Sequence, residues 1–366
     1  MRIDNPSVTL ADEARTGVTE EARFGFLDWL HSFSVRGNNG KEYMLGGSIL
    51  SLFQEKLDVV SINIAEGFGK SEQLESAIYR VGRYPGMIEE WMLHNPEGTL
   101  KIEKREHSVF VTCGKEYQVE CFDDHKWHLM VSSPDGKYKA DLYHMPQGNP
   151  LWYGREKPSY LTQHSVTYGY NWAGSVSGTI WLYGEEIKVE GAGIRERYVA
   201  TDSSAAELGG WEDWGWFCFK EIHSSLYDMR LGMKDLAVND LVTGKYYPEG
   251  KMTIHHEDWT FLRELDGFIP SVYVIRIELE DGIYEIRAHV GNATTWGATH
   301  KVPDNPVATL HYDSVEGTFT NKDGSVRTLT GGRGTMSIRQ WHAYPNIIPR
   351  ELYSDEVLKG EKFTTL

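Results

Sequence analysis

An eleven-residue stretch, GGWEDWGWFCF at residues 209–219, combines three tryptophans and two phenylalanines with two adjacent acids. A carboxyl group beside indole rings loses solvation, so its pKa rises and it can hold a proton near neutral pH. Such a group can protonate an alkene or an enol. In a strand, side-chain alternation places Asp213 on the face opposite Trp214 and Trp216. The alternative is an exposed polar turn at 211–213 that precedes a core strand.

A charged cluster, GAGIRERY at 191–198, ends the strand-like segment EEIKVEG. Alternation predicts that Arg195 and Arg197 share one face and that Glu196 lies on the other. In a functional site, either arginine could clamp a carboxylate or an enolate, or hold Glu196 in a fixed orientation. A solvated charge run where the strand ends is the alternative interpretation.

Further polar and aromatic candidates stand in aromatic surroundings. His164 and Tyr168, in TQHSVTYGYNW, are the stronger pair because they begin the stretch that leads into residues 180–198. The others are His31, in DWLHSF, and Trp296, in NATTWGATH; Trp211 joins Trp214 and Trp216 as a candidate wall of a binding site. No serine-hydrolase elbow, P-loop, HExxH or dinucleotide fingerprint is present, which argues against hydrolases, kinases and dehydrogenases of those types.

Two histidine pairs are candidate metal ligands. His125 and His128 are three residues apart, and His255 directly precedes His256. On a strand, both spacings direct the two side chains to opposite faces. A zinc site also needs a third protein ligand, for which the sequence gives no candidate. We therefore expect no metal.

The elements that must position these residues are strands. Segments of period-two hydrophobicity recur along the chain between Gly-, Asn- and Asp-rich turns, a pattern typical of an all-β protein. Helical patterning is scarce, and KSEQLESAIYRVGR (70–83), with Ser71 as N-cap, is the best candidate. With no repeat of short fixed period, the pattern predicts two antiparallel β-barrels or sandwiches with few short helices.

One hairpin can be predicted in detail. In YVIRIELEDGIYEIRAHV, a two-residue turn at Asp281–Gly282 sets Glu278 opposite Glu285, and like charges directly opposite each other are unfavourable. A shift of the register by two residues pairs Glu278 with Arg287 instead. We therefore expect a four-residue loop at 281–284.

The domain organisation follows from the least patterned stretch, VATDSSAAELGG at 199–210. We expect an N-terminal arm over 1–20, a first β domain over 21–205, a second over 206–345 and a C-terminal tail over 346–366. The length of 366 residues suits two domains.

Charge and cysteine content limit the partners and the compartment. The formal net charge of −16 repels nucleic-acid phosphates and anionic membranes, so we expect neither as a partner. No apolar run is long enough to span a membrane, and the N-terminus shows no secretory signal. The three cysteines, Cys113, Cys121 and Cys218, are expected to be buried thiols of a cytoplasmic protein, although Cys113 and Cys121 could face each other across a hairpin. A monomer or homodimer is expected.

The order of these motifs resembles the AttH-like and carotenoid 1,2-hydratase (hydroxyneurosporene synthase) family. The resemblance rests on TQHSVTYGYNWAGSVSGTIWLYGEEIKVEGAGIRERY, then WEDWGWFCF, then ATLHYDSVEGTFTNKDGSVRTLTGGRGTMSIRQ, over residues 160–340. Arg195–Glu196 match part of the family's DREW-type motif, and Trp214–Phe217 overlie its WDWF-type strand. The sequence departs at Ile194 and Arg197 in the first motif and at Gly215 in the second, and GTMSIRQ lacks the tyrosine and the glutamate of the C-terminal pattern.

The resemblance implies two lipocalin-like (calycin-type) β-barrel domains, with a ligand cavity at or near their junction. It also implies cofactor-free chemistry on apolar small molecules. Family members and relatives include hydratases of isoprenoid double bonds and cyclases that assist pericyclic ring closure.

The leading hypothesis is a cofactor-independent lyase, hydratase or cyclase that acts on a hydrophobic isoprenoid- or polyketide-like substrate of secondary metabolism. Asp213 or Glu196 would donate a proton, the tryptophans would flank the developing cation, and His164 or Tyr168 would orient water. Arg195, Arg197, His31 and Trp296 would help to bind the substrate. The alternatives are a non-catalytic carrier of an apolar molecule and a pericyclase that works by shape alone.

Overall fold

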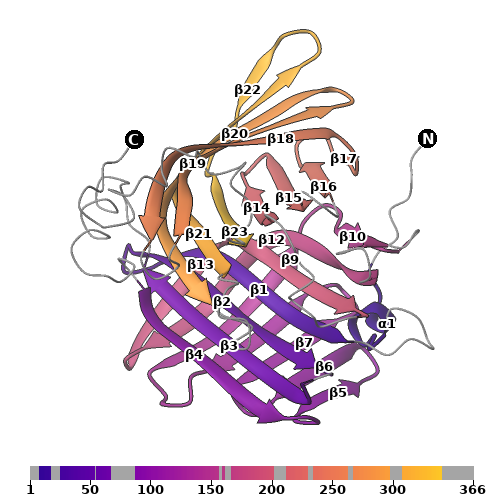
Figure 1. Cartoon of the computed structure of the whole chain (residues 1–366), viewed down its shortest axis with the longest axis vertical. Helices are drawn as coiled ribbons and strands as arrows, with labels where there is room; N and C mark the ends of the chain where they lie inside the picture. Colours follow the sequence, from indigo (N-terminus) through magenta and orange to yellow (C-terminus); the bar gives the residue numbers. More distant parts are fainter. Residues whose placement is uncertain are drawn as a thin grey trace.

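The computed structural model describes residues 8–17, 25–53, 55–66, 87–155, 159–160, 166–201, 212–229, 234–262, 267–296 and 307–339. These residues form one helical turn, α1 (Leu10–Glu13), and two antiparallel sheets (Figure 1). The all-β fold predicted from the period-two pattern is confirmed.

The first sheet is built from thirteen strands. They are β1 (Phe26–Gly37), β2 (Glu42–Leu52), β3 (Leu57–Glu66), β4 (Met87–Pro96), β5 (Leu100–Lys104), β6 (Ser108–Cys113), β7 (Tyr117–Phe122), β8 (Trp127–Ser132), β9 (Tyr138–Pro146), β10 (Leu151–Tyr153), β11 (Ser159–Tyr160), β12 (Val166–Leu182) and β13 (Glu185–Ala200). Their main order is β4-β3-β2-β1-β13-β12-β9-β8-β7-β6-β5, with β10 and β11 paired to β12.

The second sheet is built from ten strands. They are β14 (Glu212–Cys218), β15 (Ile222–Met229), β16 (Lys234–Asp240), β17 (Lys245–Tyr247), β18 (Lys251–Leu262), β19 (Gly267–Leu279), β20 (Gly282–Trp296), β21 (Val307–Asn321), β22 (Val326–Thr328) and β23 (Arg333–Arg339). Their order is β17-β16-β15-β14-β23-β21-β20-β19-β18, with β22 paired to β21. The sheets thus come from two separate stretches of chain, and the predicted boundary at 205–206 falls between them, outside the described residues.

Each sheet curls around an apolar core of its own (Figure 1). In β7 and β8 the buried and partly exposed residues alternate strictly, because one face meets the core and the other meets water. Trp127, Leu129 and Val131 of β8 are buried in the first core, and Tyr273, Ile275 and Ile277 of β19 in the second.

The alternation ends where the two sheets meet. In β13 the first residues alternate between exposed and buried, whereas the last eight residues are all buried. Both faces of this half of the strand are covered, one by the first core and the other by a separate aromatic cluster that includes side chains of β14. Figure 1 shows the second sheet lying across β1, β12 and β13. We call this contact region, with the residues of that cluster, the junction.

The hairpin prediction needs a correction. The observed turn is the residue pair 280–281, with Leu279 opposite Gly282, so the loop is shorter than the expected 281–284. This register sets Arg276 opposite Glu285, and their side chains form an ion pair at 2.6 Å. The avoidance of like charges was the right criterion. The observed register also avoids like-charge pairs, but it does so by shortening the loop, whereas we expected a longer loop.

Several predictions fall partly or wholly outside the described residues. The expected helix at 70–83 and the C-terminal tail at 346–366 lie there entirely. Within the predicted N-terminal arm, residues 8–17 are described and contain α1, whose acids Asp12 and Glu13 are buried. All three cysteines are described and are buried free thiols, as expected.

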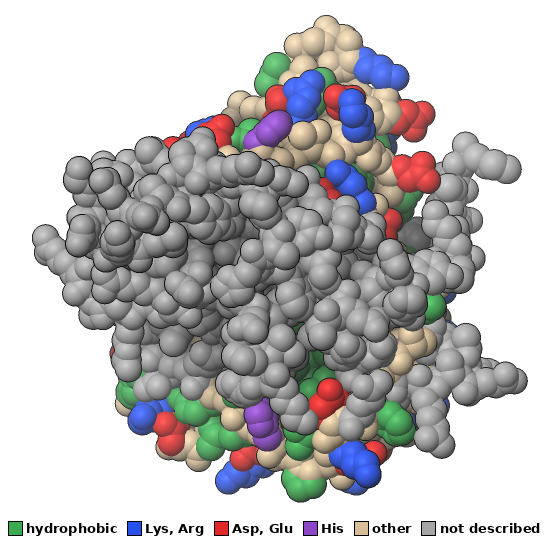
Figure 2. Space-filling view, in the orientation of Figure 1, with side chains coloured by type: hydrophobic (Ala, Val, Ile, Leu, Met, Phe, Trp, Pro, Cys, Tyr) green, Lys and Arg blue, Asp and Glu red, His purple; other side chains and the backbone are tan. Residues whose placement is uncertain are grey.

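The described surface carries charges of both signs. On the hairpins of the second sheet, Arg276 pairs with Glu285, and Arg287 pairs with Glu257 at 2.6 Å. Figure 2 shows acidic and basic side chains side by side at this end of the molecule. Among the described helices, none is long and apolar enough to cross a membrane.

Candidate functional site

The junction joins the predicted tryptophan wall to the first sheet. Trp214 and Trp216 project from β14 into the junction cluster, where Leu30, Ile194 and Tyr198 of the first sheet meet them. Trp216 Nε1 donates a hydrogen bond to Ser32 Oγ at 3.3 Å, and Ser32 Oγ lies 3.1 Å from Thr335 Oγ1 of β23. Both tryptophans therefore lie between the sheets, where the resemblance places a ligand cavity.

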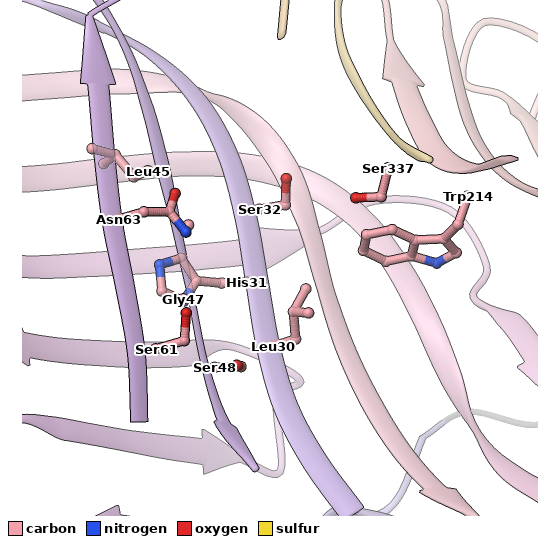
Figure 3. Close-up of a pocket in the computed structure, with 11 residues that line it drawn as sticks. Leu30, His31, Ser32, Leu45, Gly47, Ser48, Ser61, Asn63, Trp214 and Ser337 are labelled. Carbon is pink, nitrogen blue, oxygen red and sulfur yellow. The ribbon is translucent and has the colours of Figure 1, made fainter. Parts of the chain in front are cut away.

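A cleft opens beside this contact (Figure 3). It encloses about 30 Å³, and about 380 Å³ when the space at its mouth is included. The enclosed volume lies well below the range for small-molecule sites, and the larger value includes open solvent, so a bound molecule would extend out of the mouth of the cleft. The lining residues are Leu30, His31, Ser32, Leu45, Gly46, Gly47, Ser48, Ser61, Asn63, Trp214 and Ser337.

One wall of the cleft is polar and comes from β2 and β3. Ser48 and Ser61 are opposite each other in the register, as are Gly46 and Asn63. A Cβ at position 46 would lie 2.5 Å from Asn63 Oδ1, so the Asn63 side chain lies over the backbone of Gly46. Ser48 Oγ is buried without a hydrogen-bond partner. It can bond a polar group of a bound molecule.

His31 borders the cleft from the side of the first core. Its Nδ1 lies 2.6 Å from the Tyr117 hydroxyl. Burial lowers the pKa of His31 to about 3, so the ring is neutral at physiological pH. His31 can therefore take part in binding as a neutral hydrogen-bonding group but not as a cation.

Glu196 lies on the face of β13 opposite Arg195 and Arg197, as alternation predicted, and this face meets the junction. Its Oε2 accepts a hydrogen bond from the Tyr153 hydroxyl at 3.1 Å, and Asn171 Nδ2 in turn donates to the Tyr153 oxygen. Burial and the charge of Glu196 raise the pKa of Tyr153 well above its usual value, so Tyr153 keeps its proton. Leu30, which lines the cleft, is the direct cross-strand neighbour of Glu196. The carboxyl group is therefore held in one orientation, one strand from the cleft.

Asp213 lies inside the second sheet and not at the junction. It is 0% exposed, and its Oδ1 accepts a hydrogen bond from the Tyr273 hydroxyl at 3.1 Å. His256 Nε2 lies 3.2 Å from Asp213 Oδ2. The structure does not bring Asp213 together with Trp214 and Trp216, because the pleat of β14 sends them to opposite faces.

Arg195, Arg197 and Tyr168 lie on the far side of the first sheet from the junction. The guanidinium groups stack on aromatic rings inside the first sheet, with Arg197 3.8 Å from the ring centroid of Trp29. The Tyr168 hydroxyl donates to Asp12 of α1 at 2.5 Å. These residues form a second polar cluster, separate from Glu196.

The other predicted residues are not placed by the structure. His164 and Trp211 lie outside the described residues, and Trp296 ends β20 with a side chain that is not described. Their roles stay predictions.

Sequence reasoning missed several residues of the site. Tyr153 bonds Glu196, which is 43 residues away along the chain, and Asn171 bonds Tyr153, which is 18 residues away. No local motif marks either residue. A signal did exist for the polar wall, since Ser48, Ser61 and Asn63 occupy strand positions that alternate with core residues.

Metal ligation finds no support in the described ranges. There, no group of three His, Cys, Asp or Glu side chains converges as a metal site would require. His256 is bonded to Asp213, and its neighbour His255 is exposed on the other face of β18.

Comparison with known proteins identifies structures that share the fold of this chain. No family model matches the sequence, and no curated protein matches it. Among solved structures, a Nitrosomonas europaea protein assigned to AttH superposes with a TM-score of 0.58 at 13% identity, covering 92% of this chain and 98% of that one. Kievitone hydratase from Nectria haematococca gives 0.56 at 9% identity, covering 92% and 97%. CghA with Sch210972 gives 0.56 at 10% identity, covering 92% and 97%.

These matches define the class of protein by its fold: a chain of two curled antiparallel sheets. The chain has the fold of the AttH, kievitone hydratase and CghA structures over nearly its whole length. The resemblance drawn from the motifs is thereby confirmed as a shared fold. At these identities, the activity has to be argued from this chain's own site.

Proposed function

We propose that this protein is a cofactor-independent small-molecule enzyme, a hydro-lyase or cyclase, whose substrate binds in the junction cleft. The observation that carries the proposal is the buried carboxyl group of Glu196, fixed by Tyr153 one strand from a cleft that has one apolar and one polar wall. Leu30 and Trp214 would pack against an isoprenoid- or polyketide-like skeleton. Ser48 and Asn63 would bond an oxygen of the substrate.

In this mechanism Glu196 is the general acid–base. The directed chain from Asn171 through Tyr153 to Glu196 holds one carboxyl oxygen in place, because each hydroxyl or amide donates to the next group. Fixed geometry is what a proton transfer to carbon or oxygen requires. The face of the Trp214 ring would stabilise positive charge that develops on the substrate.

The kinship in fold supports the same proposal. Kievitone hydratase is named for a hydration, and CghA has been solved with Sch210972 bound. A protein with this fold can therefore carry a small molecule, and one with this fold is a hydratase. The assignment of either property to this chain is part of the proposal.

The test is turnover on a panel of isoprenoid alkenes and polyketide dienes, followed by mass spectrometry. Glu196→Gln keeps the shape of the side chain and removes the titrating group, so it should lower kcat at least 100-fold. Glu190→Gln, at an exposed position on the same strand, is the matched control and should leave kcat unchanged. Equal turnover by wild type and Glu196→Gln would remove Glu196 from the mechanism.

A non-catalytic carrier is the second candidate, because Trp214 and Leu30 could bind an apolar molecule without any reaction. A carrier would quench tryptophan fluorescence on binding and return the ligand unaltered. In that case Glu196→Gln and wild type would bind the panel equally and release no product.

A further inference from the structure

The end of the first sheet is covered by the chain's own N-terminal segment, residues 8–17 (Figure 1). Val8 packs against Tyr170 and Trp172, while Leu10 and Ala14 pack against the first core. The segment therefore directs apolar side chains, together with the acids of α1, toward the core that the curled first sheet encloses.

A set of donors converges on the carboxylate of Glu13. Its Oε1 accepts hydrogen bonds from Trp127 Nε1 at 3.0 Å and from the Tyr170 hydroxyl at 2.5 Å. Arg195 Nη2 lies 3.7 Å from the same oxygen. These three side chains come from β8, β12 and β13, so the sheet itself builds a carboxylate-binding site.

Glu13 leaves some hydrogen-bonding atoms of this site without partners. Arg195 is fully buried among the rings of Trp127, Trp172 and Tyr170, and its Nη1 donates to the His125 carbonyl. Arg195 Nε and Nη2 have no hydrogen-bond acceptor, and Glu13 Oε2 has no donor. A carboxylate that met the guanidinium edge with both oxygens would satisfy both nitrogens, as Arg–carboxylate pairs commonly do.

Arg197 holds the segment by its backbone. Its Nε donates to the Glu13 carbonyl at 3.2 Å, and its Nη2 donates to the Arg15 carbonyl. The remaining bonds, from Nη1 to the carbonyls of Asp28 and Tyr198, stay within the sheet. Two bonds of Arg197 therefore hold the segment, and the two made by Nη1 remain when the segment leaves.

We propose that this end of the first sheet is a binding site for an apolar carboxylate, and that residues 8–17 occupy it as an internal competitor. The ligand carboxylate takes the place of Glu13 beside Arg195, Trp127 and Tyr170. Its hydrocarbon body takes the space of Leu10 and Ala14. The site is independent of the junction cleft, because Arg195 and Glu196 point to opposite faces of β13.

Charge selects the ligand. The interior holds two buried guanidinium groups, of Arg195 and Arg197, and Glu13 supplies an opposing charge next to Arg195. A neutral molecule that displaced Glu13 would leave Arg195 buried without a counter-charge, which is strongly unfavourable. An alcohol of the same chain length should therefore not bind here.

The test uses dodecanoate as the probe and dodecanol as its neutral match, with the full-length protein. Dodecanoate should raise the Tm, and it should accelerate cleavage by trypsin after Arg15 at least fivefold because the segment leaves the sheet. Glu13→Gln weakens the internal competitor, so it should bind dodecanoate at least tenfold more tightly than wild type. Glu190→Gln, the exposed control on β13, should bind like wild type.

Two variants of Arg195 complete the experiment. Arg195→Gln should abolish the effect of dodecanoate. Arg195→Lys keeps the charge but loses the planar guanidinium group, so it should weaken dodecanoate binding about tenfold. Arg195→Lys also replaces Arg195→Gln in the test if the latter does not fold. Equal stabilisation by dodecanol and dodecanoate would overturn the proposal. So would unchanged cleavage after Arg15, or equal affinity of wild type and Glu13→Gln for dodecanoate.

Discussion

Acidification of the protein to pH 5 should cost stability through His31, a lining residue of the junction cleft. Burial holds the pKa of the folded-state ring at about 3, against an unfolded value of 6.5. A group whose folded pKa is depressed in this way is neutral in the folded protein and binds protons in the unfolded chain. For a histidine, this contribution is complete above pH 6.5 and is lost as the pH falls toward 3.

The magnitude follows from the two pKa values. Each pH unit below 6.5 costs about 1.36 kcal/mol, so His31 alone should remove about 2 kcal/mol of the free energy of unfolding between pH 6.5 and pH 5. Burial also lowers the pKa of His223 to about 4 and that of His144 well below its usual value. All three histidines therefore act in the same direction in this window.

The assay compares wild type with His31→Phe, which places a ring of similar size beside Phe33 and Tyr117. Urea unfolding at pH 7 and pH 5 should show that the variant loses about 2 kcal/mol less than wild type on acidification. The ¹³Cε1 resonance of His31 should also show no titration above pH 5. Equal losses in the two proteins, or a His31 resonance that titrates near pH 6.5, would refute the reasoning.

Three further outcomes are expected from the same structure. Trp216→Phe removes the hydrogen bond to Ser32 and part of a buried ring, so urea unfolding should show a loss of about 1–3 kcal/mol, and an unchanged free energy of unfolding would contradict this. Gly46→Ala should expel the Asn63 side chain from its place over the backbone and weaken ligand binding in the cleft, whereas unaltered binding in titration would show that Asn63 does not form the wall. The three cysteines should react with a thiol reagent only after denaturation, because they are buried and burial raises the pKa of Cys113 to about 12; a thiol that reacts in the native protein would contradict their burial.

The sequence allowed the faces of the strands to be predicted, because side-chain alternation is a local property of the pleat. It placed Arg195 and Arg197 together, Glu196 opposite them, and Asp213 opposite Trp214. It could not show what covers each face. The predicted single site combined Asp213 with the tryptophans, whereas the structure covers Trp214 with the first sheet and encloses Asp213 in the second.

Contacts between distant segments set the limit of the prediction. Glu13 meets Trp127 across 114 residues and Tyr170 across 157, so the carboxylate site at the end of the first sheet has no local sequence signature. In the sequence, the second half of β13 is a run of glycines and charged residues, compatible with either a solvated strand end or a functional cluster. Burial of that run at the junction is a tertiary effect that the residue types alone do not specify.

The central claim is that Glu196 exchanges a proton with a substrate held in the junction cleft. The most direct measurement is turnover in D₂O of an alkene from the panel that the wild-type protein converts, with mass spectrometric analysis of the product. We predict that wild type introduces one deuterium at carbon, that Glu196→Gln introduces none, and that Asp213→Asn still does so. Deuterium incorporation by Glu196→Gln at the wild-type rate would contradict the account, as would its loss in a folded Asp213→Asn variant alone.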